Sequence, residues 1–436
     1  MTTLQDSDVT DQMLHRRATP LQAAYWAAAA DPLGERLHVI IASVYLFMLP
    51  ISTAPRDIAS VVLLVMAILR LPKIASSYRS WFIQPIWWAM LAYMAWMSVA
   101  LFWTPDVESG LVDLKKHRML LTPILLWPVL ANARVLIGAF LAGIAFVDVM
   151  QILQWLQWPN GSWGPAVSRH GAFNNAIVTG LFNALALCFW VRLLVFSPKR
   201  FPWLPAAGLA LAIFGLGLSA SRGPIMAAMV GVLLALAVPF VTQSRLRGRI
   251  FCIVALGAVL MVPAVMAKWD VLSRQFGVIV VEYRQADARP QTSLGMRWQM
   301  AKYGMDVFRE HPILGVGTGG VGATLPPGQE LPGVPSGSRV TLHNTYILAL
   351  ATLGIPGLVL LIGLLAAGVW QAAPMAAGPL WAGGAFFGLF VWGLAAVGDA
   401  YQASGNYLGA LGFLLAMALL GSKQLSDGAQ TASKTA

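Results

Sequence analysis

Charged residues are scarce in this sequence. Asp, Glu, Lys and Arg make up only 11% of the 436 residues, whereas 58% are hydrophobic. Soluble globular domains carry roughly 25% charged residues. The shortage excludes water as the main solvent of the folded chain, so we expect a protein embedded in a lipid bilayer.

Cysteine is scarce as well, and we expect no cleaved signal peptide. Cys188 and Cys252 are the only two cysteines, and both lie in apolar runs, where a thiol behaves as a small hydrophobic group. They predict neither a disulfide framework nor a zinc site. The first 36 residues lack the basic, apolar and small-residue series of a signal peptide.

Long apolar runs follow one another along the chain, separated by short polar breaks. A bilayer core about 30 Å thick needs roughly 20 apolar residues per helix, and no alternating pattern of barrel strands occurs. We therefore predict an all-α polytopic membrane protein of about twelve transmembrane helices, with kinks at Pro123, Pro128 and Pro356 whose freed carbonyls neighbouring helices cover. The expected spans are 37–53, 57–72, 82–103, 119–132, 135–155, 174–196, 203–219, 224–241, 250–267, 343–370, 377–397 and 404–421.

One connection is far longer than the others, and loops of such length are usually functional or disordered. It runs between spans 9 and 10, and the helical apolar spacing of SLGMRWQMAKYGMDVFREHP predicts that it is partly helical. The expected organisation is 1–36, an N-terminal segment; 37–267, helices 1–9; 268–342, the loop domain; 343–421, helices 10–12; and 422–436, a disordered tail.

The distribution of lysine and arginine predicts the orientation. Short loops rich in positive charge stay in the cytoplasm, which places both termini there and the long loop on the outer side. Several basic residues then face outward against the rule. Snorkelling to lipid headgroups explains any one of them, whereas as a set they suit a polyanion such as a lipid diphosphate. They are Arg56, Lys115, Lys116, Arg118, Arg169, Arg222 and those of the long loop.

The net charge of +11 does not predict nucleic-acid binding, because it is scattered over membrane loops without a basic stripe or a nucleic-acid motif. The glycine-rich stretch ILGVGTGGVG in the long loop does not predict a nucleotide site either, since it lacks the lysine and serine or threonine that end a P-loop. A glycine turn packed against membrane helices is the alternative interpretation.

His343 lies where the long loop enters the next apolar run. A histidine there can exchange a proton near neutral pH beside an outer-leaflet substrate, although capping and interfacial histidines are also common at such places. Asn344 and Tyr346, which follow it, suit a helix start and an aromatic belt equally well.

Four segments in this order resemble the O-antigen ligase and polymerase superfamily. They are LSASRGP around Arg222, SLGMRW around Arg297, EHPILGVGTG at 310–319 and LHNTYILALATLGIPG at 342–357. The resemblance implies a membrane-embedded, inverting glycosyltransferase in a bacterial inner membrane, independent of metal and of other cofactors. Its donor would be a glycan on undecaprenyl diphosphate, and in ligases the acceptor is a sugar hydroxyl of the lipid A core on the periplasmic side.

The resemblance also implies roles for particular residues. Arg222 and Arg297 match arginines thought to hold the donor diphosphate, and His343 matches the histidine assigned to the acceptor or to acid-base work. Further donor-binding candidates, with looser matches, are Arg169, Lys115, Lys116 and Arg118; supporting candidates are Asn174, His311, Asn344 and Tyr346.

The expected chemistry explains the need for such residues. Negative charge grows on the leaving diphosphate as the sugar becomes cation-like, and one prearranged positive contact can contribute several kcal/mol in the transition state. The outer face lacks an Asp-x-Asp pair, so no metal is expected. Four acidic residues are of interest: Asp148, deep in a span, is either a site residue or a helix-helix contact, while Asp306, Glu310 and Asp399 are possible bases.

Three other functions fit the sequence less well. O-antigen polymerases often carry two sizeable outer loops, and protein O-oligosaccharyltransferases commonly extend into a large outer domain after the last span. A lipid or glycan transporter would show internal repeats and more ionisable residues at mid-membrane. Besides donor and acceptor, membrane lipids are the expected partners, and monomer and dimer both stay open.

Overall fold

The computed structural model describes residues 19–158, 170–197, 202–277, 292–325, 342–379, 381–399 and 404–422. Every regular element in these ranges is a helix, which confirms the all-α class. Seven helical stretches are long and apolar enough to cross a membrane, and shorter apolar helices accompany them. The polytopic membrane fold is thereby supported, while the number of about twelve spans stays a prediction.

The α-helices are, in chain order, α2 (Pro20–Ala30), α3 (Pro32–Met48), α4 (Thr53–Ile74), α5 (Pro85–Val99), α6 (Val107–His117), α7 (Thr122–Leu126), α8 (Ala133–Trp155), α9 (Ala176–Val195), α10 (Trp203–Ser219), α11 (Arg222–Thr242), α12 (Arg247–Met266), α13 (Trp269–Gly277), α15 (Ser293–Glu310), α16 (Thr345–Ala372), α17 (Gly384–Ala395) and α18 (Gly405–Ala418). Short 3₁₀ segments join several of them. The helices α13 and α15 lie within the long connection at 268–342, whereas the tail predicted at 422–436 lies outside the described residues apart from Ser422.

The region predicted as the fourth span is not one regular α-helix. It consists of the 3₁₀ segment Arg118–Leu121, the short helix α7 and the 3₁₀ segment Trp127–Asn132. Pro123 and Pro128 have no N–H to donate, so the α-helical hydrogen-bond ladder is interrupted twice. The change between α- and 3₁₀-helix is thus observed here, while the kinks at these two prolines stay a prediction.

Hydrogen bonds between distant segments sort the helix ends into two groups. At one end, Arg192 donates to the carbonyl oxygens of Met375 (3.0 Å) and Ala376 (2.6 Å). At the other, Asn174 donates to the carbonyl of Pro50 over 2.7 Å, and the backbone N–H of Thr345 to that of Ala396 over 2.9 Å. We call the first the Arg192 end and the second the His343 end. The helices run between them, as expected for membrane-crossing segments.

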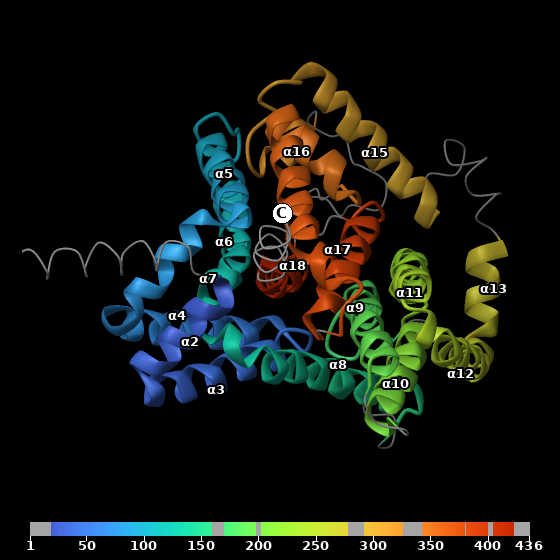
Figure 1. Cartoon of the computed structure of the whole chain (residues 1–436). Coiled ribbons are helices and arrows are strands. Elements are labelled where there is room, and N and C mark those ends of the chain that lie inside the picture. Colours follow the sequence, from blue (N-terminus) through green and yellow to red (C-terminus); the bar gives the residue numbers. More distant parts are fainter. Residues whose placement is uncertain are drawn as a thin grey trace, which may run out of the picture.

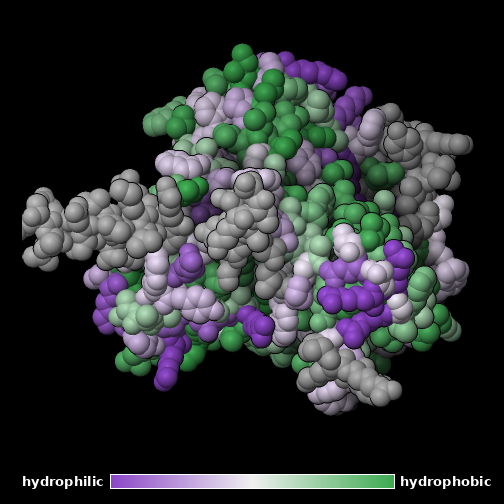
Figure 2. Space-filling view, in the orientation of Figure 1, coloured by the Kyte–Doolittle hydropathy of each residue, from purple (hydrophilic) through white to green (hydrophobic). Residues whose placement is uncertain are grey.

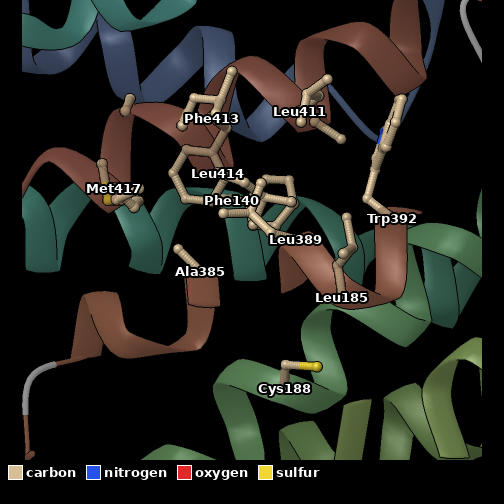
Figure 3. Close-up of a cluster of buried hydrophobic side chains, with 14 of the residues drawn as sticks. Phe140, Leu185, Cys188, Ala385, Leu389, Trp392, Leu411, Phe413, Leu414 and Met417 are labelled. Carbon is tan, nitrogen blue, oxygen red and sulfur yellow. The ribbon is translucent and has the colours of Figure 1, made fainter. Parts of the chain in front are cut away.

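The centre of the bundle is built around α18, whose residues Gly405–Ala418 are all buried. Figure 1 shows α17 and α18 in the middle, with α5 to α7 on one side and α9 to α11 on the other. Phe140 of α8 packs on Phe413 with 4.4 Å between ring centroids, beside Leu185 and Leu389 (Figure 3). Because hydrocarbon surrounds such a bundle, close van der Waals packing of this kind holds its helices together.

The outside of the bundle is apolar over wide areas. Large hydrophobic side chains such as Leu233, Phe251 and Val259 are well exposed, and hydrophobic residues cover much of the face in Figure 2, with hydrophilic ones gathered in patches. In a soluble protein this much exposed apolar surface would mark an interface. Here it suits contact with lipid, in agreement with the membrane fold.

Helix α16 is broken at Gly354, which has a φ of 68°. Pro356 has no N–H for the carbonyl of Thr352, and Gly317 donates to that carbonyl over 2.9 Å instead. In the same way Val316 donates over 2.9 Å to the carbonyl of Ala351. The kink predicted at Pro356 is thus present, but a loop, and not a helix, covers its carbonyls.

That loop, residues 312–320, is the glycine-rich stretch of the sequence, and we call it the glycine segment. Gly315, Gly317 and Gly319 have φ values of 64°, 91° and 78°, a region that favours glycine. Its amides bind helix carbonyls, which agrees with the interpretation of a glycine turn packed against membrane helices. Through these hydrogen bonds the glycine segment connects the end of α15 to the first third of α16.

Replacing Gly354 by alanine tests this attachment. With a φ of 68° and a ψ of −167°, Gly354 lies in a backbone region that essentially only glycine adopts and that costs an L-residue about 1–3 kcal/mol, and a Cβ atom would lie 2.1 Å from the carbonyl oxygen of Ile313. We expect a lower free energy of unfolding for Gly354→Ala in detergent. Gly363→Ala on the same helix is the control, because its Cβ meets nothing within 4 Å. Equal unfolding midpoints for the two variants would contradict the attachment.

Candidate active site at the His343 end

His343 and Asp399 form a pair between two helix ends. The imidazole Nδ1 lies 2.8 Å from the Asp399 carboxylate, with side-chain exposures of 36% and 15%. Thr345 donates from its hydroxyl to the Asp399 carbonyl over 2.9 Å, which fixes the segment after α17 against the start of α16. A carboxylate at Nδ1 orients the ring and leaves Nε2 able to exchange a proton with a third group.

Asn344 and Tyr346 hold the start of α16. The Asn344 side chain accepts from the backbone N–H of Tyr346 (2.9 Å) and of Ile347 (3.0 Å), as an N-cap does. The Tyr346 hydroxyl donates over 2.7 Å to the carbonyl of Gly393 on α17. These contacts favour a structural role for both residues. Asn344 and Tyr346 position His343 and need not contact a substrate.

Arg222 is the first residue of α11, and the backbone at the start of this helix lies close in space to the His343–Asp399 pair. A Cβ atom on Gly398 would come within 3.9 Å of the Cα atom of Gly223, so the start of α11 adjoins the residue before Asp399. The preceding turn contains Ala220 in the left-handed conformation, with a φ of 45°. Such strain persists only where the surroundings fix it, and it often occurs at functional sites.

A second pair of titratable groups lies beside the same turn. The His170 backbone N–H donates to the carbonyl of Leu218 over 3.1 Å. The pKa of the His170 imidazole is lowered to about 4, first by burial and second by the positive charge of Lys268. Burial also lowers the pKa of Lys268 itself, whose residue exposure is 8%. From the sequence, Lys268 is only one of several basic residues of the long loop, and its place beside the α10–α11 turn becomes visible in the structure.

A chain of polar side chains joins five more residues at this end, and we call it the Arg56 network. The Asp57 carboxylate binds Arg56 over 2.6 Å and Arg118 over 3.1 Å. Arg56 also donates to the side-chain oxygen of Asn406, whose amide donates over 3.2 Å to Asn174. Two candidates predicted separately, Arg118 and Asn174, therefore belong to one network.

Sequence reasoning identified this network in part. Arg56 stood out as an outward basic residue that breaks the charge rule, but it was not assigned to the site. Asn406 gave no signal, because a single amide at the start of an apolar run has several ordinary explanations. The neighbouring cations behave differently: Lys116 pairs with Asp113 over 3.1 Å, whereas Lys115 is exposed.

Helix α15 lies across the His343 end and carries Arg297 near its start (Figure 1). Met300 and Val307 of α15 pack in one cluster with Leu342 and Leu348, so the helix contacts the residue before His343. Arg297 precedes Met300 by three positions and is half-buried on that side of the helix. The structure thus holds Arg297 on the element that covers the His343 region.

Three of the remaining candidates have their contacts away from the His343–Asp399 pair, and a fourth is outside the described residues. His311 is exposed beyond the end of α15, about 21 Å of helix from Arg297, and lines a separate cavity of about 540 Å³ with Trp103. Arg169 lies outside the described residues. Asp306 pairs with Arg309 at the surface, and Asp148 is buried in the membrane region against Asn183.

Within the residues that the structure describes, no group of three or more His, Cys, Asp and Glu side chains suits a metal ion. The reaction's independence of metal stays a prediction. The arrangement at the His343 end offers positive charge and one proton-exchanging pair.

The fold and this site define a helical membrane protein with a polar, cationic centre at one end of its bundle. Residues 207–362, from within α10 to the second half of α16, match the family model described as O-antigen ligase, which supports assignment of the chain to the O-antigen ligase family. The resemblance predicted from the four motifs is confirmed. The family indicates a glycosyltransferase-like membrane enzyme. A comparison with curated proteins finds no match.

The Arg56 network yields a prediction on stability. Asn406→Leu removes an acceptor from Arg56, which is only 4% exposed, and should lower the free energy of unfolding by about 1–3 kcal/mol. Asn406→Asp keeps an oxygen for the guanidinium and should unfold at a higher temperature than the leucine variant. Thermal unfolding in one detergent compares them. If both variants unfold like the wild type, Arg56 does not depend on this contact.

Proposed function

We propose that the chain is an O-antigen ligase that transfers a glycan from undecaprenyl diphosphate to a sugar hydroxyl of the lipid A core. The observation that carries the proposal is the His343–Asp399 pair beside the start of α11. His343 and the start of α11 lie in the segment that matches the family, and Asp399 follows that segment in the sequence. It supplies a proton acceptor and, in Arg222, a cation at one place. Transfer of a glycan from a diphosphate requires both.

The proposed step breaks the bond between the anomeric carbon of the donor and a diphosphate oxygen. The acceptor oxygen forms the new bond from the opposite face, which inverts the configuration. The acceptor's proton passes to Nε2 of His343, and the Asp399 carboxylate at Nδ1 stabilises the imidazolium that results. The electron pair of the broken bond leaves on the diphosphate, so the donor needs no nucleotide or metal for its activation.

Positive charge must meet the leaving diphosphate, and Arg222 is best placed to supply it. Its helix begins beside residue 398, next to the proposed base. We assign Arg297 as a second cation, because it lies on α15, whose Met300 and Val307 pack with Leu342 next to His343. We keep Arg118 and Lys116 as secondary cations, Lys115 and Arg169 as untested ones, and Asn174 as a residue that supports the fold. Each arginine can bind phosphate oxygens in a bidentate manner.

We further propose that the His343 end faces the periplasm of a bacterial inner membrane, with both termini in the cytoplasm. The distribution of lysine and arginine over the short loops supports this orientation. The long connection before His343 is the only such stretch in the sequence, which favours a ligase over a polymerase.

Variants of the proposed base test the mechanism. His343→Ala should lower kcat for transfer by about 10²–10⁴-fold, because general-base catalysis contributes that much. Asp399→Asn keeps the shape but not the charge and should lower kcat by at least about tenfold. Asp306→Asn is the matched control, since its partner is the exposed Arg309. If all three variants transfer like the wild type, the pair is not the reacting centre.

The role of Arg222 is tested separately by measuring glycan transfer with purified protein, undecaprenyl-diphosphate glycan and lipid A core in nanodiscs. Arg222→Ala should lose about 10²–10³-fold in kcat as one transition-state contact disappears, and Arg222→Lys should keep part of it. Arg309→Ala, an exposed arginine on α15, should behave as wild type. Glycan on the core identifies a ligase, whereas a longer lipid-linked glycan with the core unchanged would identify a polymerase.

A further inference from the structure

An apolar cavity lies at the Arg192 end of the bundle, between α8, α9 and α10 (Figure 1). It encloses about 670 Å³ and reaches from Trp203 to Leu211 on α10, about 12 Å of helix. Trp203 and Leu204, which line it, are 72% and 58% exposed, so the cavity opens on the outside of the bundle. Around a membrane-spanning bundle the outside is lipid, and a hydrocarbon chain can enter there.

Three tryptophans indicate the depth of this cavity in the bilayer. Trp190, Trp203 and Trp381 line it. Tryptophan rings gather at the level of the lipid head groups, because one part of the ring is apolar and its N–H is polar. The guanidinium group of Arg134 lies over the Trp381 ring, 5.7 Å from its centroid. The tryptophans therefore place the outer part of the cavity at the head-group level, with a cation beside it.

A smaller, polar cavity adjoins the apolar one, because Phe196 and Pro379 line both. It encloses about 360 Å³, and its other lining residues are Thr242, Gln243, Ser244 and Arg245. Arg245 is exposed, and none of the ion pairs among the described residues involves it. The polar cavity thus offers a guanidinium group and two hydroxyl groups next to an apolar space.

The side chain of Gln243 gives the polar cavity a free acceptor. Its amide nitrogen donates to the carbonyl of Ala377, and this contact fixes which way the amide points. Its Oε1 atom is buried and has no hydrogen-bond partner within the part of the chain that the structure describes. An acceptor left unpaired in this way is unfavourable, and a hydroxyl group of a ligand would satisfy it.

The chain around the two cavities carries positive charge without negative charge. No Asp or Glu occurs in the surrounding segments, which are 133–147, 186–197, 202–212, 238–249 and 373–383. Arg134 and Arg245 are both exposed there. Two acidic side chains at the start of α3, those of Asp31 and Glu35, are already paired with Arg70 over 3.3 Å and 3.0 Å. Such unopposed positive charge at the membrane surface attracts anionic lipids.

We propose that the two cavities form one binding site for an anionic phospholipid with a hydroxylated head group, namely phosphatidylglycerol. One acyl chain fills the apolar cavity and the phosphate contacts Arg245 in the polar one. A hydroxyl group of the head group donates to Oε1 of Gln243. Arg134 attracts the same phosphate from the α8 side. With the orientation proposed above, this lipid comes from the cytoplasmic leaflet, at the opposite end of the helices from His343.

Other ligands match the two cavities less well. A water-soluble anion would leave the apolar cavity unfilled, although burial of apolar surface is the larger contribution that this site offers. A zwitterionic phospholipid would bring its own ammonium group next to Arg245, and like charges repel each other. A fatty acid would fill the apolar cavity but has no hydroxyl group for Gln243. Phosphatidylglycerol supplies the chain, the negative charge and the hydroxyl group together.

Two glycine substitutions test the apolar cavity. Gly138 lines it and Gly363 is exposed on α16, and a Cβ atom at either meets nothing within 4 Å. Gly138→Trp should fill the cavity without displacing its neighbours, and Gly363→Trp introduces the same side chain elsewhere. If the Gly138 variant does not fold, Ala142→Leu narrows the same cavity.

Two arginine substitutions test the polar cavity. Arg245→Gln removes its cation and keeps a polar side chain. Arg79→Gln removes an exposed cation from the 3₁₀ segment Ala75–Ile83, which packs on α2, α4 and α5 and lines neither cavity. It is therefore the matched control for a change in net charge.

The measurement is lipid binding to the delipidated full chain in detergent, followed by native mass spectrometry with phosphatidylglycerol and phosphatidylcholine of identical acyl chains. The wild type should bind one phosphatidylglycerol at least about fivefold more tightly than phosphatidylcholine, since each arginine near an anionic head group contributes about that factor. Arg245→Gln should lose this preference, whereas Arg79→Gln should keep it. Gly138→Trp should weaken the binding of both lipids about tenfold, because the acyl chain loses its place, and Gly363→Trp should bind as the wild type does.

Three results would overturn the proposal. The first is equal affinity of the wild type for the two lipids, and the second is equal affinity of Gly138→Trp and Gly363→Trp for phosphatidylglycerol. The third is displacement of the bound lipid by excess glycerophosphoglycerol, the water-soluble head group, since the polar cavity alone would then account for binding. No glycan donor takes part in these measurements, so they test the lipid site independently of the proposed transfer reaction.

Discussion

The break in α16 determines how the rest of the His343 end is built. A bilayer offers no partner for a free carbonyl, so the two carbonyls released at Gly354 and Pro356 must be paired by protein. The glycine segment pairs them through the amides of Val316 and Gly317. The end of α15 is thereby tied to the first third of α16, and α15 packs near the start of α16, which His343 precedes. The need to pair the carbonyl groups of α16 inside the membrane thus fixes the position of α15 beside His343.

The same requirement keeps the polar side chains of this end in one place. Arg56 is nearly inaccessible and is held by Asp57 and Asn406. His343 is held by Asp399. Groups that are already paired and oriented need little reorganisation when charge develops, which is the main source of electrostatic catalysis. The strained Ala220 turn before Arg222 fits this description as well, because its cost is tolerated where packing fixes the backbone.

Much of this was predictable from sequence, and the remainder was not for definite physical reasons. Apolar run lengths gave the helical membrane fold, and the proline in α16 gave its kink, because both follow from local rules. Four motifs gave the family. The pairing of His343 with Asp399 and the link from Arg118 to Asn174 were not predictable, since they join residues 56 positions apart or more. Arg169 lies outside the described residues, so its predicted role stays open.

The central proposal is that this protein breaks the bond between a glycan and a polyprenyl diphosphate. The most direct measurement uses a donor with one radiolabel in the glycan and another in the diphosphate, incubated with the purified chain and lipid A core. The account predicts that the glycan label moves to the core while the diphosphate label stays on free polyprenyl lipid, in equal amounts. If both labels stay together, with donor merely moved between leaflets, the protein is a transporter and the account is contradicted.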